Sequence, residues 1–389
     1  MPTKYPSSHY AKTALTGFGI LVLLMHASAF ARDNSRVGIS ESFVMDTNPS
    51  MREENEETIY GSETRAFFIY DRGTPVSDFE TELGVSYNKF NDSTYDSTDF
   101  SATANYNRET LRWLFGLNGF ARYDTTRDED LSNVDLIRSD RRFSWQVAPR
   151  LGYALSPISQ ALLTSSWQEV YYEFEELTDY RVISANPEYS YELTPLQQIS
   201  ASLRLRRYMT LEGEDRMIDS VGPYFGWIYN FHPKYTLSLF AGALASDYSG
   251  YTDAPDGWDV NPIYSANLSY NGLRNRTSLG ITRTRNPYNN GTDYDLTRVG
   301  IENLFTITPL WALNTGLSYR KSEQDDFASN SLDSSWEESV ALNYKPSDQW
   351  TVSLSQRYKN EELTDGQDAD RNIIKLNLRY SFGGIEEEY

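Results

Sequence analysis

The chain has 389 residues, a formal net charge of −20 and no cysteine, and aromatic residues make up 14% of it. The acidic charge excludes ordinary nucleic-acid binding, which needs the opposite sign, and the lack of cysteine excludes a disulfide framework and a lipid-anchored lipoprotein. Neither a linker nor a change in composition divides residues 36–382, so we expect a single domain.

Residues 1–31 have the pattern of a secretory signal peptide. Lys4 and Lys12 precede an apolar run from Ala14 to Met25, and small residues follow as far as Ala31. We therefore expect cleavage after Ala31 and export of the mature chain. A single membrane anchor is the alternative, but the uncharged run is shorter than the roughly 18 residues that a spanning helix needs.

Residues 32–382 contain repeated segments in which apolar and polar residues alternate. The alternation is clear at 79–88, 112–118, 142–153, 311–320 and 350–358. A strand sends successive side chains to opposite faces, and alternating segments of about ten residues are typical of membrane β-barrels. The sequence therefore predicts an all-β chain that forms a transmembrane antiparallel up-and-down barrel over residues 32–382.

Short and long connections alternate between these segments. The short ones are turn-like, at 107–110, 156–159, 193–196, 231–234, 271–274, 308–310 and 345–348. The long ones are acidic, at 46–57, 124–140, 211–219, 247–261, 321–335 and 359–371. Short periplasmic turns and long extracellular loops are typical of an outer-membrane barrel. We count about eighteen strands, with about 16 as the alternative because residues 36–45 and 165–174 alternate poorly.

The last alternating segment, 375–382, has one polar face and one apolar face. The apolar face consists of Leu376, Leu378, Tyr380 and Phe382. It resembles the C-terminal insertion signal of Gram-negative outer-membrane proteins, which implies contact with the barrel-insertion machinery, outer-membrane lipid and lipopolysaccharide. A large soluble β-sandwich or β-helix is the alternative, but aromatic pairs at strand ends, such as Trp311 with Tyr319, are typical of membrane-interface girdles. A short acidic tail, 383–389, follows.

Several short motifs recur at the ends of segments. They are Tyr153-Ala-Leu-Ser-Pro157, Tyr191-Glu-Leu-Thr-Pro195 and, after the first segment, Asp46-Thr47-Asn48-Pro49. These motifs resemble those of outer-membrane β-barrel porins that occur with exopolysaccharide export and exosortase-type surface systems. The resemblance implies a channel for passive passage of polar solutes, with a link to exopolysaccharide export, and it transfers no catalytic residue. The alternative is a structural or assembly partner of a surface-polysaccharide system, with a lumen closed by loops.

Residues with obvious catalytic or metal-binding chemistry are few. His232 is the only histidine after the signal peptide and falls in a predicted turn, so we expect neither a histidine-assisted hydrolase nor another enzyme. No phosphate-binding glycine loop or dinucleotide motif is present, so we expect no cofactor. Acidic residues gather at Asp253, Asp256 and Asp259 and around Asp124, but without a complete metal-ligand spacing, and solvated loops are the expected reading.

By alternation, the polar face of the strands lines the lumen and carries two sets of charged residues. The basic set is Arg112, Arg122, Arg142, Arg150, Arg204, Arg206, Arg298, Arg320, Arg357, Lys375 and Arg379. The acidic set is Glu63, Glu80, Glu82, Glu188, Glu192, Glu302 and Glu337. A wall of arginine could select anions or bind sugar hydroxyls and carboxylates. The alternative is that these charges pair with one another and only keep the wall hydrated.

Overall fold

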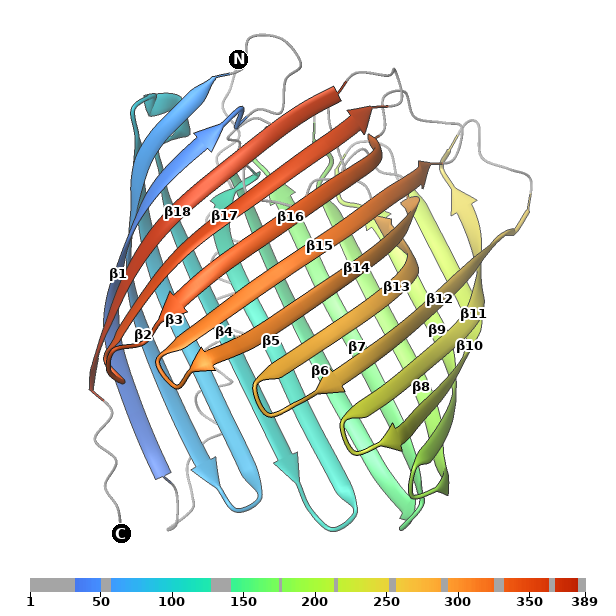
Figure 1. The fold of residues 1–389 in the computed structure, drawn as a ribbon. Coiled ribbons are helices and arrows are strands. Elements are labelled where there is room, and N and C mark those ends of the chain that lie inside the picture. The colour runs from blue at the N-terminus through green and yellow to red at the C-terminus, as the bar shows by residue number, and fades with distance from the viewer. Residues whose placement is uncertain are drawn as a thin grey trace.

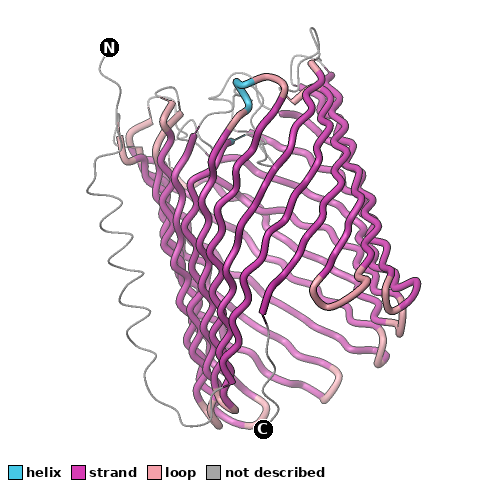
Figure 2. The backbone as a smooth tube through the Cα atoms, turned by 90° about the vertical axis from the view of Figure 1, so that its left-hand side faces the viewer, coloured by secondary structure: helices cyan, strands magenta, loops and turns pink. Residues whose placement is uncertain are grey.

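The computed structural model describes residues 32–49, 57–126, 141–174, 177–212, 216–251, 257–287, 293–324, 332–363 and 368–383. The predicted signal peptide and the tail beyond Gly383 lie outside these residues. Within them the chain forms a ring of tilted strands (Figures 1 and 2). Each strand pairs with the next in antiparallel fashion, and the pairing of β1 with β18 closes the ring. No described segment is a helix long and apolar enough to cross a membrane.

The strands have the following bounds. The first nine are β1 Arg32–Thr47, β2 Thr58–Thr74, β3 Ser77–Phe90, β4 Ser97–Glu109, β5 Trp113–Thr125, β6 Arg141–Ser156, β7 Ser159–Tyr172, β8 Tyr180–Thr194 and β9 Gln197–Thr210. The others are β10 Met217–His232, β11 Tyr235–Ser249, β12 Asp259–Asn271, β13 Asn275–Pro287, β14 Asp293–Thr308, β15 Trp311–Gln324, β16 Leu332–Tyr344, β17 Trp350–Leu363 and β18 Asp368–Gly383. A single helical turn, η1 (Ser93–Tyr95), follows β3. The predicted antiparallel barrel is confirmed, with 18 strands rather than sixteen.

At one end of the barrel, the turn rim, tight turns join successive strands (Figure 1). Two-residue links that begin with proline join β2 to β3, β6 to β7, β8 to β9, β10 to β11 and β14 to β15. Proline fixes φ at the first turn position, where its missing N–H costs nothing. The residue before it often caps the turn, because the Thr74 hydroxyl accepts from the Ser77 N–H at 3.0 Å and the Thr308 hydroxyl accepts from the Trp311 N–H at 3.2 Å. The opposite end, the loop rim, carries η1 (Figure 2).

Burial identifies the inner and outer faces of the strands. Tyr208 on β9 and Ile218 on β10 have no exposed surface, whereas their neighbours Arg207, Met209 and Asp219 are accessible. Because nothing described packs against the outside of the ring, a side chain without exposed surface lies inside it. Directly paired residues of antiparallel strands share a face, so the register carries this assignment around the barrel.

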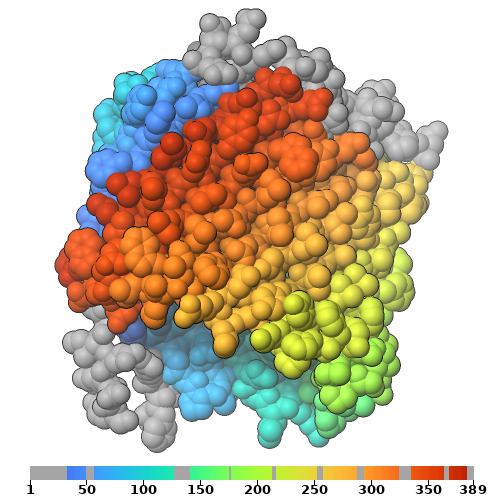
Figure 3. All heavy atoms as spheres, viewed as in Figure 1, coloured from blue at the N-terminus to red at the C-terminus, as the bar shows by residue number. Residues whose placement is uncertain are grey.

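The outer face is apolar and carries aromatic pairs near both ends of the strands. Val37, Phe43 and Leu354 are each more than half exposed there, at 54%, 53% and 52%. Trp311 packs on Tyr344 and Trp350 on Tyr380 at the turn rim, and Tyr319 packs on Trp336 nearer the loop rim. On the face shown in Figure 3, the side chains of neighbouring strands meet without a gap. The register also places Leu376, Leu378, Tyr380 and Phe382 on the outer face.

Two outward carboxylates explain why two segments alternate poorly although both form strands. Glu41 on β1 accepts a hydrogen bond from the Thr64 hydroxyl at 2.6 Å. Glu169 on β7 accepts from the indole N–H groups of Trp145 and Trp167, both at 3.1 Å, and from the hydroxyl of Tyr171 at 2.6 Å. Each carboxylate stands at an outer position where the pattern demands an apolar residue.

Candidate functional site: the barrel lumen

The register gives each predicted lumen residue a place. Arg204 and Arg206 alternate with Leu203 and Leu205 on β9 and share the inner face with Tyr208. The other members of both charged sets occupy inner-face strand positions in the same way, except for one. Arg112 lies in the turn between β4 and β5, where its guanidinium donates to the Tyr153 hydroxyl at 3.4 Å. This residue therefore belongs to the turn rim and not to a strand wall.

Many of the inner-face charges form ion pairs with neighbouring strands. Arg65 pairs with Glu82 at 2.6 Å, and Arg142 pairs with Asp124 at 2.8 Å. Further pairs on this face are Arg36 with Asp71, Lys375 with Glu63, Arg371 with Asp46, and Glu337 with both Arg320 and Arg357, and within β17 Lys359 pairs with Glu361. Sequence reasoning missed several of these residues. Most of them lie near strand ends, where no register could be assigned: Arg36, Asp46, Asp71, Lys359, Glu361 and Arg371. Arg65 was missed although it lies in the middle of β2.

A smaller group of lumen arginines has no acidic partner among the described residues. The Arg204 guanidinium lies over the Tyr224 ring at 4.2 Å, and that of Arg379 lies over the Phe67 ring at 4.1 Å. Arg122 sits over Phe120 in the same manner at 5.0 Å. Arg150 and Arg298 are exposed and form neither type of contact, and four acids, Glu80, Glu188, Glu192 and Glu302, likewise form no ion pair with described residues.

The lumen is packed with apolar and aromatic side chains toward the loop rim. One cluster consists of Val182, Tyr208 and Ile218, against which Tyr180, Tyr248 and Tyr251 pack. A second cluster on the β1–β3 side contains Val44, Ile59, Phe90 and Tyr95, with Ile373 packed against it. These inward side chains narrow the lumen at the loop rim and leave the turn-rim half more polar.

The end of the β13–β14 hairpin lies inside the barrel. The ladder between β12 and β13 stops at Tyr264 and Arg283, whereas β13 and β14 stay paired as far as Pro287 and Asp293. Alternation would place Arg285 and Asp293, near the end of this hairpin, on the outer face. Both contact inner-face residues of other strands instead. The hairpin end therefore leaves β12 and bends into the lumen.

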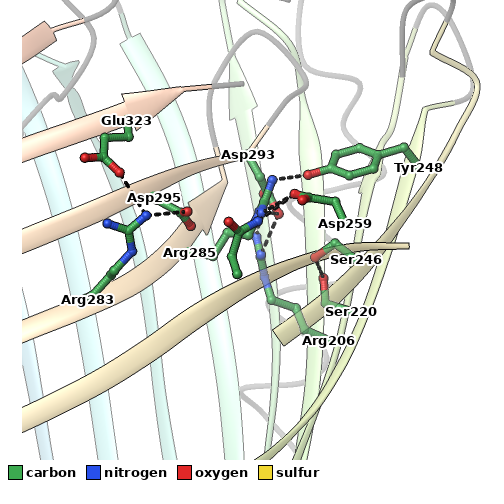
Figure 4. Close-up of polar contacts among 11 residues, drawn as sticks. Arg206, Ser220, Ser246, Tyr248, Asp259, Arg283, Arg285, Asp293, Asp295 and Glu323 are labelled. Carbon is green, nitrogen blue, oxygen red and sulfur yellow. Dashed lines mark hydrogen bonds and ion pairs between the residues drawn. The ribbon is translucent and has the colours of Figure 1, made fainter. Parts of the chain in front are cut away.

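A network of arginine and carboxylate groups holds the bent hairpin end, as Figure 4 shows. Asp293 has no exposed side-chain surface and accepts two hydrogen bonds from Arg206 of β9, at 2.9 and 3.0 Å. Arg285, whose side chain is 1% exposed, pairs with Asp259 of β12 at 2.9 Å and donates to the Tyr248 hydroxyl. We call these four residues, Arg206, Asp259, Arg285 and Asp293, the latch. It ties β14 to β9 across part of the lumen.

The predicted acidic clusters take structural roles where the structure describes them. Asp259 belongs to the latch, and Asp124 pairs with Arg142, while Asp253 and Asp256 lie outside the described residues. No group of three or more His, Cys, Asp or Glu side chains among the described residues could hold a metal ion. His232 lies at the turn rim, where its Nδ1 accepts from the Lys234 N–H at 3.1 Å.

The inner wall is hollowed over β12 to β16, in the turn-rim half of the lumen. This hollow has a volume of about 690 Å³, and amide, hydroxyl and charged side chains line it together with glycines. Arg298, Glu302 and Glu337 of the predicted sets lie in its wall. The lumen therefore combines a packed, latched loop-rim end with a polar space below it.

Several solved membrane barrels resemble this fold at low sequence identity. The outer membrane channel DcaP of Acinetobacter baumannii is 12% identical, with a TM-score of 0.44 over 92% of this chain and 99% of that chain. OccK11 (OpdR) of Pseudomonas aeruginosa is 14% identical, with a TM-score of 0.49 over 91% and 96%. The siderophore receptor PirA of Pseudomonas aeruginosa is 11% identical, with a TM-score of 0.48 over 89% and 80%. No protein-family model and no curated protein matches the sequence.

Proposed function

We propose that this protein is a passive channel of the Gram-negative outer membrane for small polar solutes. The observation that carries the proposal is a closed ring of 18 strands whose inner face is polar and whose outer face is apolar. Barrels of 16 to 18 strands leave an aqueous lumen rather than a side-chain core, as in porins. The polar hollow of about 690 Å³ is such a space.

The composition of the outer face supports localisation in the outer membrane. Two bands of aromatic residues, represented by Trp311 with Tyr344 and by Tyr319 with Trp336, bracket apolar side chains, as girdles do at the two interfaces of a bilayer. The predicted export signal at residues 1–31 and the insertion signal that ends at Phe382 agree with this place. Outer-membrane lipid, lipopolysaccharide and the barrel-insertion machinery are then the expected partners.

The pairing of the lumen charges points to weak ion selectivity. Most inner-face arginines and lysines have an acidic neighbour, so their fields largely cancel. Cations without such a neighbour, among them Arg150 and Arg204, lie on the same wall as the unpaired acid Glu188. A modest preference for anions is the most that this distribution supports. We assign no cofactor and no catalytic step to the lumen.

Planar-bilayer recording of the refolded full-length protein tests the channel. We expect stepwise conductance increments with a reversal potential close to zero in a salt gradient. Correct folding is checked first by the heat-modifiable gel mobility typical of membrane barrels. Correctly folded protein that gives no stepwise conductance would reject the proposal.

A second candidate function is a structural or assembly role in a surface-polysaccharide system, with the lumen closed at its extracellular end. The packing of Tyr208 and its neighbours at the loop rim and the latch favour this candidate. The link to exopolysaccharide export rests on the resemblance of the short motifs alone. Deletion of the gene separates the two candidates, because unchanged polysaccharide release together with slower solute uptake supports the channel, and the reverse pattern supports the assembly role.

A further inference from the structure

The hollow in the wall of β12 to β16 lies over three inner-face glycines on neighbouring strands. Gly280 on β13 pairs directly with Gly300 on β14, and Gly316 on β15 pairs with the neighbouring Glu302. A Cβ atom at Gly300 would meet its nearest atoms at 3.5 Å, which is ordinary contact, so packing does not demand glycine there. The effect of these glycines is to remove side chains from the wall and leave room for a bound molecule.

Side chains that both donate and accept hydrogen bonds surround this glycine floor. The lining includes Asn267, Ser278, Asn314, Ser318 and Ser339, and it contains no aromatic residue. Amide and hydroxyl groups match a ligand whose own groups also donate and accept, as alcohol groups do. An aromatic ligand would find no aromatic side chain to stack on here.

The hollow carries charges of both signs, with Arg276 and Arg298 against Glu302 and Glu337. Arg298 and Glu302 flank Gly300 on the same face of β14, and neither forms an ion pair with a described residue. Glu337, on the far side, stands between Arg320 and Arg357 at 3.8 and 3.9 Å. A small anion attracted to Arg298 is repelled by Glu302. A small cation attracted to Glu302 is repelled by Arg298. An uncharged ligand with several hydroxyl groups can accept from the guanidinium and donate to the carboxylate at once.

We propose that this hollow binds a small uncharged polyhydroxylated solute, such as a sugar or a polyol, on its way through the lumen. The proposal rests on the proposed channel function and adds its solute class. Arg298 and Glu302 bind hydroxyl groups at the two ends of the solute. The middle of the solute packs on Gly300, which lies between them on β14. The amides and hydroxyls of the neighbouring strands complete the hydrogen bonds.

Isothermal titration of the refolded full-length protein in detergent measures binding without conduction. Maltose is the uncharged probe and citrate is the anionic one. We expect maltose to bind and citrate to bind more weakly or not at all. Binding of citrate without maltose, or of neither probe, would overturn the proposed solute class.

Three variants locate the site. Gly300→Val fills the floor of the hollow, and Glu302→Gln combined with Arg298→Gln removes both charges that hold the hydroxyls. Each should weaken maltose binding by about tenfold or more, because Gly300→Val leaves less room for the solute and the double variant removes two hydrogen bonds to charged groups. Ala148→Val is the matched control, because it adds the same kind of bulk to the inner face of β6, away from the hollow. Equal loss in the control, or no loss in either test variant, would refute the location.

Planar-bilayer recording of the same refolded proteins distinguishes failure of the solute site from failure of the channel function. Maltose should interrupt the ion current of the wild type and not that of Gly300→Val. Maltose binding without any conductance would leave the site standing and reject the channel. Conductance without maltose binding would support the channel and reject the site.

Discussion

Asp293 of β14 accepts two hydrogen bonds from the guanidinium of Arg206 of β9, and the two strands are separated around the ring by β10 to β13. Asp293 also lies 3.7 Å from Nε of Arg285, so one buried carboxylate lies beside both arginines. The contact spans part of the lumen rather than following the sheet. It therefore fixes how far the end of the β13–β14 hairpin reaches over the pore.

Asp293→Asn is expected to widen the loop-rim end of the lumen. The substitution keeps the shape but leaves Arg206 and Arg285 without their shared negative charge, and the two cations then repel each other. Removing one partner of a buried ion pair costs about 3–5 kcal/mol of folding stability. The variant should therefore also unfold at a lower urea concentration. Single-channel conductance and urea unfolding measure the two effects, and we expect higher conductance and lower stability.

Asp219→Asn is the control for the latch. Asp219 pairs with Arg207, which neighbours Arg206 on β9, but this pair lies on the outer face and is half to one-third exposed. An exposed pair contributes at most about 1 kcal/mol. If Asp293→Asn matched this control in conductance and stability, the latch would not hold the hairpin.

Leu376→Arg and Asn377→Arg test the assignment of the two faces of β18. Leu376 pairs with the outer-face residues Phe43 and Leu354, and Asn377 donates to the inner-face Ser42 hydroxyl at 2.7 Å. An arginine on the lipid face near the middle of the bilayer costs about 2–4 kcal/mol, whereas the lumen tolerates it. Urea unfolding of the protein in lipid vesicles should therefore show a large loss for the first variant only. Similar losses for both would refute the facing.

Alternation predicted most of the architecture because each barrel strand has one apolar and one polar face. The sequence predicts about eighteen strands and keeps about sixteen as the alternative for a physical reason. Glu41 and Glu169 occupy outer positions, where hydrogen bonds from Thr64 and from Trp145, Trp167 and Tyr171 satisfy them. No pattern within one strand reveals Thr64 or Trp145, because these two partners lie on neighbouring strands.

The latch was beyond the reach of sequence reasoning. Arg285 and Asp293 stand at positions that alternation assigns to the outer face, and they point into the lumen only because β13 leaves β12 after Arg283. Arg206, the partner of Asp293, comes from the distant strand β9, and Asp259, the partner of Arg285, comes from the neighbouring strand β12. The lumen sets were easier because parity alone assigns a face, but which charges pair depends on the register between strands, as Lys375 with Glu63 illustrates.

The loop that contains η1 is expected to lose order in acid. The Lys89 ammonium and the Phe90 N–H both donate to Asp96 and lower the pKa of its carboxyl group. A lowered pKa in the folded state means that this stabilisation is present above the usual aspartate value of about 4 and is lost as the pH falls through the lowered pKa. Amide exchange of residues 91–96, corrected for the intrinsic rate, should accelerate in that range. Asp96→Asn should exchange fast at every pH, and unchanged exchange in this variant would contradict the assignment.

Asp46 and Arg371 form a buried pair across the seam where the first and last strands close the ring. The guanidinium donates to the two carboxylate oxygens at 2.9 and 2.6 Å, and the side chains are 3% and 10% exposed. Asp46→Asn removes the negative charge from this buried pair, so we expect a loss of about 3–5 kcal/mol in urea unfolding. Asp71→Asn is the matched control, because its pair with Arg36 also involves β1 but is 28% and 41% exposed and should cost at most about 1 kcal/mol.

A double replacement separates the two possible reasons for a large loss at the seam. Asp46→Leu together with Arg371→Met removes both charges, and replacing a whole buried pair by apolar groups is often close to neutral. Near wild-type stability in the double variant would show that the single variant fails because a charge is left buried. If the double variant is as unstable as Asp46→Asn, the hydrogen bonds of this pair stabilise the seam in addition to the β1–β18 ladder and to other side-chain contacts there, such as that from the Asn48 amide to the Asp370 carbonyl at 2.9 Å.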